Sequence, residues 1–124
     1  MGLQPERHGN HTVVRFPSRT EPDSAAELRR QLAALIKLGH TELIIDMSAT
    51  AFLNGAGTGI LFVLSQWLHA RDGSLCLAAP TRQVEHLIEH AGLTHLVTTA
   101  PSVDDAIADS SHDQPCTYPQ EIPA

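Results

Sequence analysis

The stretch Glu42-Leu-Ile-Ile-Asp-Met-Ser-Ala-Thr-Ala-Phe-Leu-Asn-Gly-Ala-Gly-Thr-Gly-Ile-Leu61 decides the fold of this chain. Its Leu-Ile-Ile core is typical of a strand that is buried on both faces of a sheet. A short connection follows, and the glycine-rich turn from Asn54 to Gly59 then opens an apolar helix. Asn54 suits the N-cap position, where its side chain accepts a hydrogen bond from the first turn. We therefore expect a buried strand, a connection and a helix start rich in glycine.

Strands and helices alternate on both sides of this stretch, which predicts an α/β domain with mostly parallel pairing. Between Pro17 and Pro22 at most an edge strand is expected, because proline cannot donate to a ladder. The expected elements in chain order are a strand at 11–16, a helix from the capping box Ser24–Glu27 to Gly39, a strand at 42–47, a helix that Asp72-Gly73 ends, a strand at 74–79, a helix at 84–91, an extended piece within 93–99 and a short helix at 102–108.

Four motifs in this order and spacing resemble the STAS domain, the fold of bacterial anti-sigma-factor antagonists. The central motif Phe52-Leu-Asn-Gly-Ala-Gly57 is similar to that family's Phe-Leu/Met-Asp-Ser-Ser-Gly. The others are Gly73-Ser-Leu-Cys-Leu-Ala-Ala-Pro80, Val84-x-x-Leu87-x-x-x-x-Gly92-Leu93 and Pro101-Ser-Val-Asp-Asp-Ala106. The resemblance covers residues 11–108. It implies a small mixed β-sheet of four or five strands with helices mostly on one face.

The resemblance also implies a role in transcription regulation by partner switching. In that family the unmodified antagonist docks on an anti-sigma factor, often a GHKL-type serine kinase, and phosphorylation of the first serine of the motif ends the interaction. Gly55 occupies that phosphoacceptor position here, so the hydroxyl is missing. By this resemblance the partner-binding residues are Asn54, Gly55, Ala56, Gly57, Thr58, Leu61 and Phe62. Three outcomes stay open: a constitutive antagonist, a partner regulated elsewhere, or a STAS scaffold in another complex. Regulation could also have moved to another residue of this chain, such as Thr58.

The glycine-rich turn has two interpretations that the residues alone do not separate. The glycines could let the helix pack closely on its own sheet, or they could leave bare N–H groups for a partner or an anionic ligand. Gly55-Ala-Gly57-Thr-Gly59 matches neither G-x-G-x-x-G nor a P-loop, which disfavours nucleotide binding. A small-ligand-sensing subunit of a transport or sensory assembly remains the alternative function.

Candidate catalytic residues are few, and we expect no enzyme, no cofactor and no metal. His86-Leu-Ile-Glu-His90 matches the H-x-x-E-H motif, but no third ligand is evident, so surface histidines are expected. Cys76 lies within a strand pattern, where a buried thiol is inert. Asp46 either caps the following loop at Ser48 and Ala49 or lines a partner surface, and the first role is favoured. Trp67 is expected to lie in the core.

Bulk properties limit the remaining function classes. The 124 residues suit one domain, and 8 Lys+Arg against 14 Asp+Glu give a net charge of −6, which disfavours direct nucleic-acid binding. No apolar run is long enough for membrane insertion, so a cytoplasmic protein is expected. Residues 1–10 are expected to be flexible and 109–124 to be a disordered tail that carries Cys116. A homodimer is compatible with the sequence.

Overall fold

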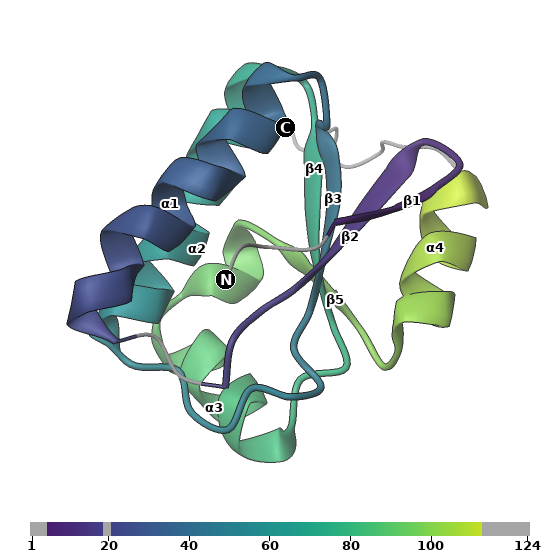
Figure 1. Ribbon diagram of the computed structural model, residues 1–124. Coiled ribbons are helices and arrows are strands. Elements are labelled where there is room, and N and C mark those ends of the chain that lie inside the picture. The colour runs from purple at the N-terminus through teal and green to yellow at the C-terminus, as the bar shows by residue number, and fades with distance from the viewer. Residues whose placement is uncertain (1–4, 19–20, 113–124) are drawn as a thin grey trace.

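The computed structural model describes residues 5–18 and 21–112, and its centre is one mixed sheet of five strands in the order β1-β2-β3-β4-β5. The antiparallel pair β1–β2 forms one edge, and β2, β3, β4 and β5 run parallel (Figure 1). The strands are β1 (Glu6–His8), β2 (His11–Arg15), β3 (Glu42–Asp46), β4 (Ser74–Ala78) and β5 (Thr98–Ala100). The predicted α/β class with a small mixed sheet is confirmed.

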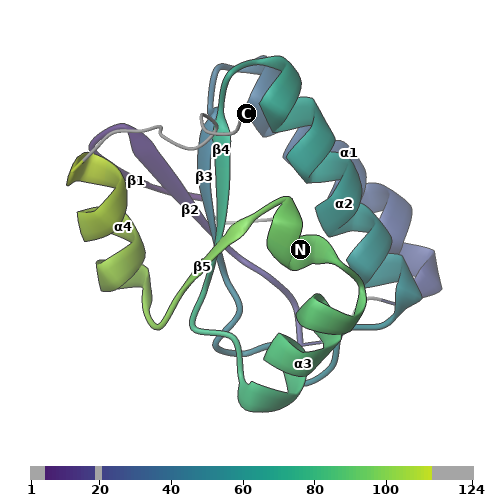
Figure 2. The ribbon, with the colours of Figure 1, turned by 180° about the vertical axis from the view of Figure 1, so that it is seen from behind.

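Helices cover the two faces of the sheet unequally. Three of them, α1 (Pro22–Lys37), α2 (Gly55–Ala70) and α3 (Arg82–His90), lie on one side together with the short 3-10 helix η1 (Leu93–His95). Among the described residues, only α4 (Val103–His112) covers the opposite face, as the two views in Figure 1 and Figure 2 show. The prediction that the helices lie mostly on one face is therefore confirmed.

The alternation of side chains along β3 explains why this strand is apolar without interruption. Leu43 and Ile45 belong to the larger core, which also contains residues of α1, α2 and α3. Ile44, between them in sequence, belongs to the smaller cluster that packs with Ala106 of α4. Because successive side chains of a strand point to opposite faces, a strand covered by helices on both sides needs apolar residues at every position.

The N-terminal edge of the sheet differs from the prediction. Residues 1–10 were expected to be loose, but Glu6–His8 form β1, and a two-residue turn at Gly9-Asn10 joins this strand to β2. Gly9 has a φ of 65°, which glycine adopts without strain and which two-residue hairpin turns require. The sequence permitted an edge strand between Pro17 and Pro22, but the described residues of that range, 17–18 and 21–22, form no strand. The edge position of the sheet is taken by β1 instead.

The start of α1 is a second correction. The helix begins at Pro22 with Glu21 as its N-cap, so the predicted capping box does not form. Proline at the first helical position is pre-organised for a helix and needs no N–H partner there, which moves the start ahead of Ser24.

Glu27 accepts hydrogen bonds from Gln31, at 2.8 Å, and from Arg30, and both contacts hold the pKa of this carboxyl below its usual value.

Helices α1 and α4 end differently with respect to the prediction. Gly39 follows Leu38, the C-cap of α1, and has a φ of 102°, as predicted for a glycine that ends a helix. Helix α4 was expected to end near Ala108, but it continues to His112. The rest of the expected tail, 113–124 with Cys116, lies outside the described residues.

Candidate functional site

The connection between β3 and α2 begins with backbone contacts to the strands on both sides of β3. The N–H of Met47 donates to the carbonyl of Ala78 at 2.9 Å, and the N–H of Phe16 donates to the carbonyl of Asp46 at 2.9 Å. The carboxylate of Asp46 accepts a hydrogen bond from the N–H of Ser48 at 3.0 Å. The predicted loop-capping role of Asp46 is thereby confirmed at Ser48. These contacts fix where the connection leaves the sheet.

Asn54 ends the connection and starts α2 as predicted. Its side-chain oxygen accepts a hydrogen bond from the N–H of Gly57 at 2.9 Å, and its carbonyl accepts one from Thr58 at 2.9 Å. The residue has an extended backbone, with φ −90° and ψ −176°, as N-cap residues do. The first turn of α2 is thus formed by the glycine-rich motif itself.

Gly55 and Gly59 are exposed, and nothing packs against them. A Cβ atom built on either residue would meet no other atom within 4 Å. The interpretation that these glycines let the helix pack on its own sheet is therefore wrong for both positions. Gly57, by contrast, is buried on the inner side of the turn. Folding explains the burial of Gly57 but gives no reason for the absence of side chains at Gly55 and Gly59.

These two glycines belong to an exposed stripe on α2. Gly55, Gly59, Phe62 and Gln66 are all exposed, and their spacing of three and four residues places them on one face of the helix. Phe62 is 43% exposed and is the large apolar side chain of this stripe. We call these four residues the α2 surface.

An exposed aromatic residue precedes the α2 surface in the chain. Phe52 lies in the connection, three residues before Gly55, and is 40% exposed. The range 47–68, which holds the connection and most of α2, contains no Asp, Glu, Lys or Arg. The exposed residues of this part of the chain are therefore uncharged, on a protein whose net charge is −6.

The structure separates the other predicted site residues of α2. Leu61 was grouped with the partner-binding residues, but its side chain has no exposed surface and lies in the larger core, so that assignment is wrong. Ala56 and Thr58 are half-buried in the first turn. Trp67 is partly buried against the larger core, as predicted. Leu61 lies three residues before the buried Leu64 and seven before the buried Leu68, on the inner face of the helix, whereas the assignment by resemblance grouped it with Phe62 on the outer face.

The candidate metal and nucleophilic residues lie elsewhere. His86 and His90 are both exposed on α3, which agrees with the prediction of surface histidines. Within residues 5–18 and 21–112, no group of three or more His, Cys, Asp or Glu residues has a geometry that could hold a metal ion. Cys76 is buried in β4, which agrees with the prediction of a buried thiol within a strand.

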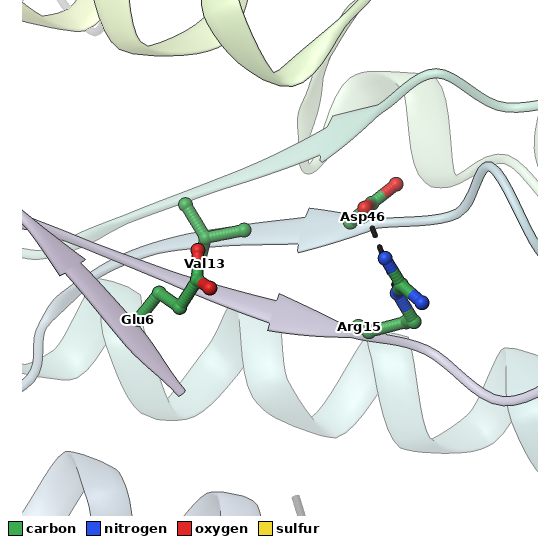
Figure 3. A pocket seen from close by; sticks show the side chains of 4 residues that line it. All are labelled: Glu6, Val13, Arg15 and Asp46. Atoms are coloured by element: carbon green, nitrogen blue, oxygen red, sulfur yellow. Dashed lines mark ion pairs between the residues drawn. The ribbon is translucent and has the colours of Figure 1, made fainter. Parts of the chain in front are cut away.

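A surface hollow that the sequence did not predict lies where β1, β2 and β3 meet, and its lining comprises Glu6, Val13, Arg15 and Asp46 (Figure 3). The guanidinium of Arg15 points toward Asp46, with 4.0 Å between Nε and Oδ2. The Arg15 side chain is 74% exposed, and such surface pairs contribute little stability. No pattern in the sequence indicated this hollow, because β1 was not expected.

Comparisons with known proteins agree with this geometry. The family model for the STAS domain matches residues 3–106. An anti-sigma factor antagonist from Mycobacterium paratuberculosis is similar in structure, with a TM-score of 0.76 and 25% identity over 86% of this chain and 90% of that chain. An anti-sigma-factor antagonist (STAS) domain protein from Planctomyces limnophilus has a TM-score of 0.77 and 12% identity over 87% and 97% of the two chains.

A third similar structure comes from a membrane transporter. The murine solute carrier 26 family member A9 anion transporter matches 83% of this chain with 18% of its own, at 22% identity and a TM-score of 0.66. No curated protein sequence matches this chain significantly. No helix in the described ranges is both long and apolar enough to span a bilayer. The family match extends over most of the sequence, and the chain therefore belongs to the STAS-domain family.

Proposed function

We propose that this protein is an anti-sigma factor antagonist that docks its partner with the α2 surface. The observation that carries the proposal is the pair of exposed glycines at the start of α2, which no internal packing requires. Bare backbone at Gly55 and Gly59 lets a partner approach the helix closely, and Phe62 supplies an apolar anchor beside it. The partner is an anti-sigma factor, with a GHKL-type serine kinase as the favoured class.

Regulation at this surface differs from the family pattern that the sequence resembles. A phosphate on a residue at the interface adds nearly two negative charges and disrupts docking. Gly55 and Ala56 carry no hydroxyl and cannot accept a phosphate. The proposed antagonist is therefore not switched at this position, and its activity follows its concentration or a change in its partner.

The structural similarity to the Mycobacterium paratuberculosis antagonist, at 25% identity, supports this function over other uses of the fold. The similarity to the transporter's domain favours a second candidate, in which this chain serves as a subunit of a transport or sensory assembly. In that case the α2 surface would contact another component of the assembly. The two candidates differ in the partner that the α2 surface binds, which is an anti-sigma factor in the first and another component of the assembly in the second.

The variant Gly55→Asp tests the proposed docking surface. A Cβ atom at Gly55 would meet no other atom within 4 Å, and a carboxylate is favourable at a helix N-terminus, so the fold should persist. Binding to the anti-sigma factor should weaken at least about tenfold, because the carboxylate would be desolvated without a counter-charge. Titration calorimetry measures the dissociation constant, and thermal melting checks the fold.

Gln83→Glu is the matched control, because it adds the same charge to the exposed first turn of α3. It should leave the dissociation constant unchanged. An unchanged constant for Gly55→Asp with an intact fold would remove the α2 surface from the interface. Failure of the unmodified protein to bind any anti-sigma factor, with capture of a transporter component instead, would favour the second candidate.

A further inference from the structure

The connection before α2 is tied to a segment that lies far from it in the sequence. The carbonyl of Ser18 accepts hydrogen bonds from the N–H groups of Ala51, at 2.9 Å, and Phe52, at 3.3 Å. The hydroxyl of Thr50 donates to the carbonyl of Pro17 at 3.1 Å. Three consecutive residues of the connection thus bind two consecutive carbonyls that follow β2.

Both sides of this contact are anchored in the core. Phe16, directly before the two carbonyls, is 1% exposed, and Leu53, directly after Phe52, is 3% exposed. Thr50 itself is 1% exposed, so water does not readily replace its hydrogen bond to Pro17. The exposed Phe52 therefore lies between an anchored residue and a buried hydrogen bond.

We propose that Thr50 is a positioning residue, which holds Phe52 in place as part of the docking surface and thereby extends that surface from α2 to Ser18. The inference rests on the proposed function, since its occupant is the anti-sigma factor. An exposed aromatic side chain is an effective anchor when its backbone is already ordered, because binding then costs less conformational entropy. The hydrogen bonds of Ala51 and Phe52 provide that order before the partner arrives.

The first test needs no partner. Thr50→Val keeps the shape of the side chain but removes its donor, while Thr50→Ser keeps the donor. Hydrogen exchange of the backbone amides of Ala51 and Phe52 should accelerate about three- to tenfold in Thr50→Val, as expected for one lost neutral hydrogen bond. Thr50→Ser should restore exchange to within about twofold of the original rate. Unchanged exchange in Thr50→Val would overturn the proposal.

The second test measures affinity for the anti-sigma factor. Thr50→Val should raise the dissociation constant about three- to tenfold. In a Phe52→Ala background it should have little further effect, because the two residues then act through the same contact. Ile88→Val, a core change on α3, controls for lost stability and should leave affinity unchanged.

Each outcome of the second test is informative. An equal loss of affinity with and without the Phe52 ring would show that Thr50 does not act through Phe52, which overturns the proposal. A loss in Ile88→Val that matches the loss in Thr50→Val would attribute the effect to stability alone. If the unmodified protein binds no anti-sigma factor, the proposed function fails and the docking role of Thr50 fails with it. The exchange measurement would still report the structural contact.

Discussion

The side chain of Asn54 accepts a hydrogen bond from the N–H of Gly57 at 2.9 Å, and this contact fixes where α2 begins. Gly57 is buried, so its N–H depends on Asn54 rather than on water. In this way the same residue that caps the helix also orients the exposed glycines of the α2 surface. Folding and the proposed docking are therefore linked at this residue.

We predict that Asn54→Ala lowers the free energy of unfolding by about 1 kcal/mol, the usual cost of losing an N-cap side chain. Asn54→Asp should retain the cap, because a carboxylate also accepts from the N–H of Gly57 and is favourable at a helix N-terminus. Urea denaturation measures both variants. Equal stability of Asn54→Ala and the unmodified protein would show that the hydrogen bond is not needed to start α2.

Two glycines should respond to alanine in opposite directions. Gly59→Ala should raise the free energy of unfolding by about 0.5–1 kcal/mol, because the added methyl meets no atom and alanine favours a helix. Gly73→Ala should lower it by about 1–3 kcal/mol, because the new Cβ would overlap the carbonyl oxygen of Thr41. That carbonyl also accepts a hydrogen bond from Ser74 at 2.9 Å, so it cannot move away freely.

Denaturant unfolding of the two glycine variants, measured side by side, gives the sign of each effect. A loss of stability in Gly59→Ala would mean that the start of α2 packs against something that the structure does not place there. Tolerance of Gly73→Ala would mean that the turn before β4 adjusts at little cost. Either result would contradict the packing described above.

The strand β3 and the start of α2 could be predicted because their signals are local. An uninterrupted apolar run, a capping residue and glycines in sequence identify a buried strand followed by a helix start. The strand β1 was missed because it has only three residues, all exposed, and the turn signal at Gly9-Asn10 was read as part of a loose terminus.

The surface of the site was harder to predict than its position. Leu61 was misassigned because the resemblance groups residues by motif, whereas their helical spacing places Leu61 with the buried Leu64 and Leu68, and Phe62 with Gly59 and Gln66. The contact of Thr50 with Pro17 joins residues that are 33 positions apart through a backbone carbonyl. Side-chain patterns do not record such contacts, so only the folded structure reveals them.

Incubation with a cognate anti-sigma kinase and ATP should leave residues 55 and 56 without phosphate, because neither has a hydroxyl. The variant Gly55→Ser is the matched positive control, since it restores a hydroxyl at an exposed position with free space around it. Intact mass and peptide mapping identify the modified residue. Stoichiometric phosphate on Thr58 of the unmodified protein would show that the switch has moved by three residues.

We predict that zinc does not remain bound to the protein after dialysis against buffer and that added zinc does not raise the protein's melting temperature. His86 and His90 lie one turn apart on the exposed face of α3, and two histidines without a third ligand hold zinc weakly. Metal analysis after dialysis and a melting curve with added zinc check this. The double variant His86→Ala/His90→Ala serves as the reference. Tight one-to-one zinc that this variant loses would assign a metal site to α3.

The affinity for the anti-sigma factor should depend little on salt. The range 47–68 contains no charged side chain, so the contact that we propose gains no ion pair for salt to screen. We expect the dissociation constant to change by less than about threefold between about 50 and 500 mM NaCl, a range over which the Debye length falls from about 14 Å to about 4 Å. Calorimetric titration at several salt concentrations measures this.

A charge placed on the α2 surface supplies the comparison for the salt dependence. Gln66→Lys adds a cation at an exposed position of the stripe, next in sequence to Trp67, which packs against the core. At low salt this variant should bind more weakly than the unmodified protein, because the uncharged interface would desolvate the ammonium group. A steep loss of affinity with salt in the unmodified protein would instead mean that charged residues outside 47–68 dominate the contact. The docking surface would then have to be sought on α1 or α3, whose exposed faces carry both signs of charge.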